Sequence, residues 1–205
     1  MSIVIIDYGL SNLNSVLNTI KNIHNNVIIT KDKTELLSAN ILILPGVGTY
    51  ADGIKNIIEY DLFNTIRLCV LEKKIPIIGI CLGMQLLATC GYEGGKTAGL
   101  NLIEGEVTKI ISSDKKYRIP HIGWNEIIHK NQSLFNNIPN NTDFYFVHSY
   151  EFIVKYKSDI LATTNYSSEI ISAIHRDNIY GFQFHPEKSQ IAGKNLLRNI
   201  IQKYI

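Results

Sequence analysis

The chain has 205 residues, of which 45% are hydrophobic and 19% are charged, so it has enough apolar material to fold around a core and too little charge for a disordered chain. Its formal charge of +2 comes from 20 basic and 18 acidic residues without long runs of either sign, which gives no electrostatic reason to expect a nucleic-acid partner or an anionic membrane surface. The length predicts a single domain over residues 1–205.

The first residues of the chain favour a strand over a secretory signal, because they lack a basic region and reach Asp7 after a short apolar run. No apolar run approaches the roughly 20 residues that a membrane-spanning helix needs. The three cysteines, Cys69, Cys81 and Cys90, are an odd set without CxxC spacing, which argues against a disulfide framework and a structural zinc site. We therefore expect a soluble protein of the reducing cytoplasm.

Short β-branched runs alternate with segments of helical period in the first half of the chain, which is typical of parallel strands covered by helices on both faces. The predicted strands there are 3–7, 27–30, 41–44 and 75–80, and the predicted helices are 12–24 and 51–73, the second with a break at 61–63. After Gly91 the predicted strands are 105–111, 144–150, 160–164, 170–175 and 180–184, with a hairpin turn at 176–178 and a final helix at 190–204. The predicted fold class is α/β: one domain with a central, mostly parallel sheet flanked by helices, and a β-rich second half.

Cys81 stands at the junction between a buried strand and a run of helix formers. The sequence Gly-Ile-Cys-Leu-Gly at 79–83 is the cysteine version of a nucleophile elbow, in which small residues on both sides permit a tight strand-to-helix turn. The N-terminus of the helix favours a thiolate, and the peptide N–H of Leu82 can donate to a developing oxyanion. The competing interpretation is a small buried hydrophobe, which is how we interpret Cys69 and Cys90 in segments that we take to be helical.

A candidate base follows the last predicted strand. Pro186 keeps His185 out of the helical region, so its imidazole projects at the end of the strand, and Glu187 faces the same side if the chain stays extended. A thiol nucleophile needs such a base and a third group that fixes the tautomer of the base. We interpret His24, His129 and His175 as structural, and His121 and His148, which stand beside aromatic residues, as lining a surface with another use.

The loop Pro-Gly-Val-Gly at 45–48 follows a predicted parallel strand and places two glycines at the sheet edge where ligands of open α/β folds bind. Glycine permits a positive φ and a close approach of backbone to ligand, so the N–H groups of Val47 or Gly48 can complete an oxyanion hole. Most Pro-Gly pairs are plain turns, and the loop therefore gains its meaning from the two motifs above.

Taken together, the segments 45–48, 79–85 and 184–189 resemble class I (triad) glutamine amidotransferases in order and spacing. The segments 7–9, 121–125 and 145–150 narrow the resemblance to the glutaminase subunits of imidazole glycerol phosphate synthases. This resemblance implies hydrolysis of L-glutamine, with ammonia passed to a (βα)8-barrel synthase subunit in a heterodimer of histidine biosynthesis. It implies no metal and no organic cofactor.

The resemblance also assigns roles to residues. Cys81 would form a γ-glutamyl thioester, His185 would shuttle protons and Glu187 would orient it. The expected oxyanion hole consists of Val47, Gly48 and Leu82, and the expected glutamine-binding residues are Gly46, Gln85, His148, Ser149 and Tyr150. Toward the synthase subunit and the ammonia gate we expect Asn12, Trp124, Tyr145 and Lys188.

Two positions depart from the family pattern, because Ser11 and Asn14 stand where glycine and arginine are expected. Both fall in the region that faces the partner, which leaves open a related amidotransferase for bacterial surface-sugar biosynthesis. A Cys-elbow hydrolase such as a γ-glutamyl peptidase, and a non-catalytic binding subunit, are two more distant hypotheses. An inert subunit has no chemical need for Cys81, His185 and Glu187 together.

Overall fold

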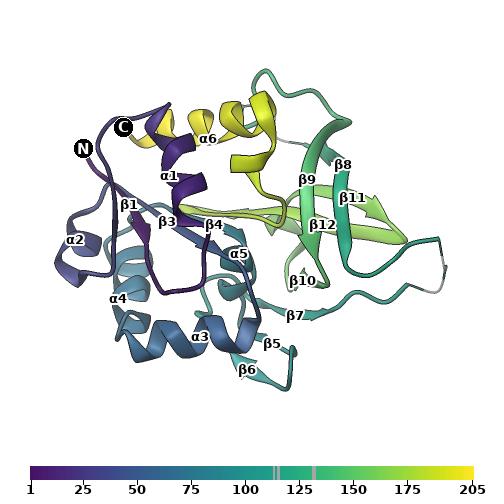
Figure 1. Cartoon of the computed structure of the whole chain (residues 1–205), viewed down its shortest axis with the longest axis horizontal. Helices are drawn as coiled ribbons and strands as arrows, with labels where there is room; N and C mark the ends of the chain where they lie inside the picture. Colours follow the sequence, from purple (N-terminus) through teal and green to yellow (C-terminus); the bar gives the residue numbers. More distant parts are fainter. Residues whose placement is uncertain (113, 115, 131–132) are drawn as a thin grey trace.

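A computed structural model describes residues 1–112, 114, 116–130 and 133–205 and places a nine-stranded sheet at the centre of the molecule (Figure 1). The strand order is β2-β1-β3-β4-β13-β12-β11-β8-β9. The first five of these strands are mutually parallel. Their bounds are β1 (Ile3–Ile6), β2 (Val27–Thr30), β3 (Ile41–Gly46), β4 (Ile77–Cys81) and β13 (Ile179–Phe182).

The other half of the sheet is antiparallel. It consists of β12 (Ser168–Arg176), β11 (Ile160–Tyr166), β8 (His121–His129) and β9 (Thr142–His148). A separate four-stranded sheet has the order β10-β7-β5-β6. Its strands are β10 (Tyr150–Val154), β7 (Gly105–Lys109), β5 (Cys90–Gly91) and β6 (Thr97–Ala98).

Helices cover both faces of the parallel half, and alternate strand residues face each layer. The layer with α1 (Leu13–Lys21) and α6 (Gln190–Tyr204) packs on Ile3 and Ile5, whereas the opposite layer packs on Val4 and Ile6 (Figure 1). The opposite layer holds α2 (Lys33–Ser38), α3 (Tyr50–Glu59), α4 (Phe63–Arg67) with a π-helical turn at Leu68–Glu72, and α5 (Leu82–Leu86). Two single 3-10 turns lie at Lys157–Asp159 and Pro186–Lys188.

The predicted α/β fold class is confirmed, but the sheet is mixed and not mostly parallel, because the strands after β13 pair antiparallel. The predicted strands and helices of the parallel half each overlap an observed element. The break in the second helix is also present, where Asp61 takes a positive φ of 54° between α3 and α4. The prediction for Cys90 is wrong: it lies in strand β5 and not in a helix, since α5 ends at Leu86. The predicted strand at 144–150 is in fact the end of one strand and the start of another, which belong to different sheets.

Candidate active site

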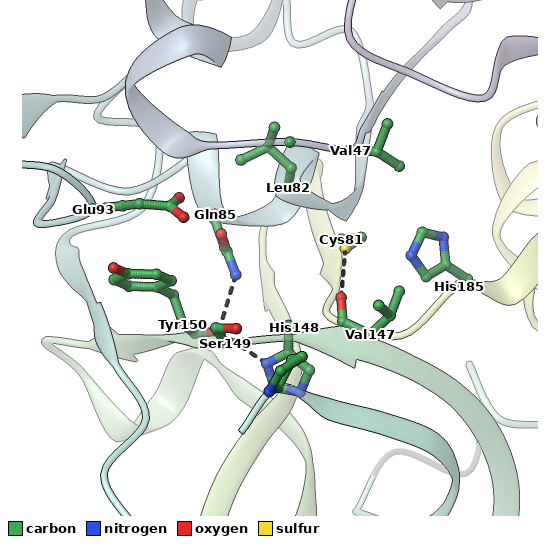
Figure 2. Close-up of a pocket in the computed structure, with 12 residues that line it drawn as sticks. Val47, Cys81, Leu82, Gln85, Glu93, Val147, His148, Ser149, Tyr150 and His185 are labelled. Atoms are coloured by element: carbon green, nitrogen blue, oxygen red, sulfur yellow. Dashed lines mark hydrogen bonds between the residues drawn. The ribbon is translucent and has the colours of Figure 1, made fainter. Parts of the chain in front are cut away.

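A cavity of about 300 Å³ opens at the carboxyl ends of the parallel strands β3 and β4. It is lined by residues of the loop after β3, the turn between β4 and α5, the junction of β9 and β10, and the end of the segment after β13. Figure 2 shows Cys81 and His185 at one end of this cavity and Glu93 and Tyr150 at the other. The space is sufficient for a ligand the size of an amino acid.

Cys81 is the last residue of β4, and its backbone is strained, with φ 54° and ψ −112°. Gly79 and Gly83 permit this turn because other backbone atoms lie so close to their Cα atoms that a side chain would clash with them. A Cβ on Gly83 would lie 1.7 Å from the carbonyl oxygen of Leu44, and one on Gly79 would lie 2.7 Å from the carbonyl oxygen of Gly83. The side chain of Cys81 enters the cavity with its Sγ 3.7 Å from the carbonyl oxygen of Val147.

His185 and Glu187 form a closed pair, with Nδ1 of the imidazole 2.7 Å from Oε1 of the carboxylate and side-chain exposures of 3% and 2%. The backbone of His185 is fixed by the carbonyl of Tyr145 and by the hydroxyl of Ser189, which donates to the His185 carbonyl. Burial alone would lower the pKa of His185, but its interactions with the Cys81 thiol and the Glu187 carboxylate outweigh burial and raise that pKa to about 9. The imidazole is therefore held as a cation beside the sulfur (Figure 2).

The loop after β3 is only partly arranged as expected. Val47 and Gly48 line the cavity, and Gly48 has a φ of +113° that favours glycine. In this conformation, however, the N–H of Val47 donates to the carbonyl of Leu10 at 2.9 Å, so it does not point to an oxyanion. Gly46 does not belong to the described lining; it packs beneath the site, where a Cβ would meet the hydroxyl of Tyr8 at 2.2 Å.

The other residues expected to hold a substrate, namely Gln85, His148, Ser149 and Tyr150, all line the cavity. It also carries Glu93, which the sequence did not suggest. One oxygen of Glu93 accepts from the N–H of Tyr50 at 2.7 Å, and the carboxylate points into the cavity (Figure 2). An acidic residue in the turn between β5 and β6, beside Gly94, was the only available signal.

Three of the four residues expected to face a partner form one cluster next to His185. The rings of Trp124 and Tyr145 are 5.9 Å apart, and the Nζ of Lys188 lies 5.7 Å from the centre of the Tyr145 ring. Tyr145 in turn lies 6.5 Å from the ring of His185. Trp124 and Lys188 are exposed, as is Asn12, the fourth residue, which immediately precedes α1.

The part of the chain that the structure describes contains no group of three His, Cys, Asp or Glu side chains placed to hold a metal ion. Within the same residues, no helix is both long and apolar enough to cross a bilayer.

This sheet, with a cysteine on a strained turn beside a histidine–glutamate pair, has the architecture of a triad amidotransferase. Residues 4–203 match the family model "Glutamine amidotransferase class-I". The chain belongs to this family of enzymes.

Two relatives cover nearly all of the chain. The chain is 40% identical over 206 residues to "Imidazole glycerol phosphate synthase subunit HisH" of Pelagibacter ubique, covering 98% of this chain and 99% of the relative. It is 45% identical over 202 residues to "Imidazole glycerol phosphate synthase subunit HisH 1" of Campylobacter jejuni, again covering 98% and 99%. Among solved structures, a glutamine amidotransferase from Thermotoga maritima is similar in fold, with a TM-score of 0.68, 18% identity and coverage of 100% of this chain and 97% of the other.

Proposed function

We propose that this chain is the glutaminase subunit of an imidazole glycerol phosphate synthase and acts in histidine biosynthesis. It hydrolyses L-glutamine to glutamate and ammonia and delivers the ammonia to a (βα)8-barrel synthase subunit in a heterodimer. The observation that carries the proposal is the Cys81, His185 and Glu187 set at one end of a cavity of amino-acid size, in a chain with full-length relatives of that name. Residues 1–205 act as one glutaminase domain, in a reducing cytoplasm that keeps Cys81 a thiol.

The first half of the reaction makes a thioester. The Cys81 thiolate attacks the side-chain carboxamide carbon of glutamine, a C–S bond forms, and the carbonyl electron pair moves to oxygen. The N–H groups of Leu82 and Gly48 are the candidate donors to this oxyanion, and that of Val47 can join them only when it leaves the Leu10 carbonyl. His185 then gives its proton to the departing nitrogen, the C–N bond breaks and ammonia leaves.

The second half releases glutamate. Neutral His185 takes a proton from water, the oxygen of that water attacks the thioester carbon, and the C–S bond breaks to restore the thiolate. Glu187 holds Nδ1 of the imidazole throughout, which leaves Nε2 free for both proton transfers.

Glutamine recognition falls to the far end of the cavity. The Glu93 carboxylate is the complementary group for the α-ammonium of an amino acid, and it lies at the end of the cavity opposite Cys81 (Figure 2). A glutamine held by this carboxylate would extend its carboxamide toward the sulfur. Gln85, Ser149 and Tyr150 surround the same region.

Ammonia is mostly protonated in neutral water and hence is not a nucleophile, so a covered path from the glutaminase to the acceptor site has a chemical purpose. The exposed cluster of Trp124, Tyr145 and Lys188 beside His185 is the candidate exit and interface. The names of the relatives favour the histidine pathway over surface-sugar biosynthesis.

The test uses Cys81→Ala in the complex with the barrel subunit, with Cys90→Ala as the matched buried-thiol control. We expect Cys81→Ala to abolish glutamate release while ammonia-dependent synthesis continues, because the acceptor site lies on the partner. Cys90→Ala should keep both activities. Loss of both activities in Cys81→Ala would show that Cys81 is structural, and persistent glutamate release would exclude it as the nucleophile.

A further inference from the structure

Gln183 is a fully buried polar side chain beside the nucleophile, and no step of the reaction above uses it. It lies just after β13, its backbone N–H donates to the carbonyl of Ser172, and its side chain runs toward the turn that holds Cys81. Its Nε2 lies 3.9 Å from the Cys81 Sγ. A buried carboxamide with a defined orientation calls for a physical reason.

The hydrogen bonds of Gln85 fix that orientation. Nε2 of Gln85 lies 3.0 Å from the carbonyl oxygen of Tyr150 and 2.9 Å from Oε1 of Gln183. Because a peptide carbonyl can only accept, the amide group of Gln85 must face Tyr150 with its nitrogen, and Gln183 must accept with its oxygen. The amide nitrogen of Gln183 is thereby turned toward Cys81, where its N–H can donate to the sulfur.

The carbonyl of Tyr150 also receives a second chain of hydrogen bonds, which begins on strand β8. Nδ1 of His148 lies 2.9 Å from this carbonyl, so His148 carries its proton on Nδ1 and accepts on Nε2. Nδ1 of His121 lies 2.9 Å from that Nε2 and donates to it. Nε2 of His121 then accepts from the side-chain amide of Asn125, at 3.2 Å. Every donor and acceptor along this chain is consistent with a single arrangement of protons.

His121 and His148 are held in the neutral state and in fixed orientations. Burial, together with the neighbouring histidine, lowers the pKa of His121 to about 3, and burial is also the main reason that the pKa of His148 falls to about 4. The ring of His121 is stacked between Phe146 and Tyr166, with ring centres 4.7 Å and 3.9 Å away. Neither ring therefore gains a charge at neutral pH, and the pair acts as a fixed relay and not as an acid or base.

We infer that Gln183 is a positioning residue that donates a hydrogen bond to the Cys81 thiolate. Its orientation is held by Gln85, which is anchored on the Tyr150 carbonyl, and that carbonyl is held in turn by the chain from Asn125 through His121 and His148. The inference rests on the proposed function only in taking Cys81 as the nucleophile. It goes beyond that function because it assigns part of the stabilisation of the Cys81 thiolate to a neutral amide, in addition to the charge of His185. A neutral donor stabilises the thiolate without competing for the catalytic proton.

The test measures the rate of alkylation of Cys81 by iodoacetamide as a function of pH, read on the Cys81 peptide by mass spectrometry. Gln183→Met keeps the approximate volume and removes the donor, and Gln183→Glu keeps the acceptor for Gln85 but places a carboxylate beside the sulfur. Ser172→Ala is the control, since Ser172 is equally buried on the adjacent strand. Loss of a hydrogen bond to a charged group predicts alkylation about tenfold slower at pH 7 in Gln183→Met, with the profile shifted about one unit to higher pH. Gln183→Glu should shift it further in the same direction.

His121→Phe tests the outer half of the relay, because phenylalanine keeps the stacking between Phe146 and Tyr166 and removes both hydrogen bonds. We expect a smaller shift than in Gln183→Met and no further shift in the double variant, since the second change acts through the first. Shifts that simply add would exclude the relay. Profiles of both Gln183 variants that coincide with those of the wild type and Ser172→Ala would overturn the role of Gln183. These outcomes are separate from those that overturn the proposed function, which are persistent glutamate release or loss of both activities in Cys81→Ala.

Discussion

Nδ1 of His185 and Oε1 of Glu187 lie 2.7 Å apart, in a place almost closed to solvent. Only Pro186 separates the two residues in the sequence. The 3-10 turn that begins at Pro186 brings the carboxylate back onto the imidazole. The pair is therefore formed locally, and only its approach to Cys81 requires the tertiary fold. This relationship makes the charge of His185 dependent on Glu187.

Glu187→Gln should move the alkaline limit of glutamine hydrolysis to lower pH. The pKa of His185 is raised to about 9, so the imidazolium that protonates the departing nitrogen persists up to that pH and is lost above it. Without the carboxylate the raised pKa falls, by about one to two units if a hydrogen bond to a charged group is lost. The measurement is kcat against pH in the complex, with Glu59→Gln, an exposed carboxylate paired with Lys55, as the control. An unchanged alkaline limit would show that Glu187 does not set the protonation of His185.

Glu93→Gln should raise the KM for glutamine about tenfold or more, because a charge-assisted contact with the α-ammonium is replaced by a neutral one. The value of kcat should change little, since Glu93 lies at the opposite end of the cavity from Cys81 (Figure 2). Steady-state kinetics of glutamate release give both values. Glu104→Gln, which removes an exposed partner of Lys155, is the control and should leave both unchanged. A fall in kcat at constant KM would instead place Glu93 in the chemistry.

Gly46→Ala should destabilise the fold by about 1–3 kcal/mol, as expected for overpacking. The new Cβ would lie 2.2 Å from the Tyr8 hydroxyl and 2.9 Å from the Cβ of Leu82. Tyr8→Phe removes the nearer atom, so the double variant should recover part of the loss in urea unfolding. The same Tyr8→Phe change should not rescue Gly83→Ala, in which the new Cβ would lie 1.7 Å from the carbonyl oxygen of Leu44. Equal rescue of both variants would mean that Tyr8→Phe stabilises the protein for another reason.

The elements that could be predicted from the sequence are those with a clear hydrophobic period. The buried parallel strands and α6 were found in this way, because each presents apolar residues at a regular spacing to a helix layer or to the sheet. Strand β8 was missed, since it buries His121 and His129 and exposes Ile122, Trp124 and Ile128. A strand is recognised in a sequence by apolar residues that alternate inward and polar residues that alternate outward, and β8 has the reverse pattern. Only the tertiary contacts of the buried histidines explain it.

Prediction of the candidate site had a similar limit. Cys81, His185 and Glu187 could be predicted because a strained turn and an X-Pro step each leave a local mark on the sequence. Gln183 and Glu93 left no such mark. Gln183 and Glu93 lie about 100 and 12 residues from Cys81 in the sequence, and they acquire a role only when the fold brings them to the same site. No local sequence pattern predicts that approach.

Trp124→Ala should weaken assembly with the barrel subunit without changing glutamine hydrolysis by the isolated chain. Trp124 is 48% exposed, packs edge-on against Tyr145, and so presents a large aromatic face next to the residue that holds His185. Truncation of a central aromatic residue in an interface commonly costs about 2 kcal/mol or more, which corresponds to a rise in Kd of about thirtyfold. Titration calorimetry with the barrel subunit gives the Kd. Leu71→Ala, a partly exposed residue of the π-helical turn after α4, is the control and should leave the Kd unchanged. If both variants bind like the wild type, the partner contacts a different face, and the exit for ammonia must be sought away from Tyr145.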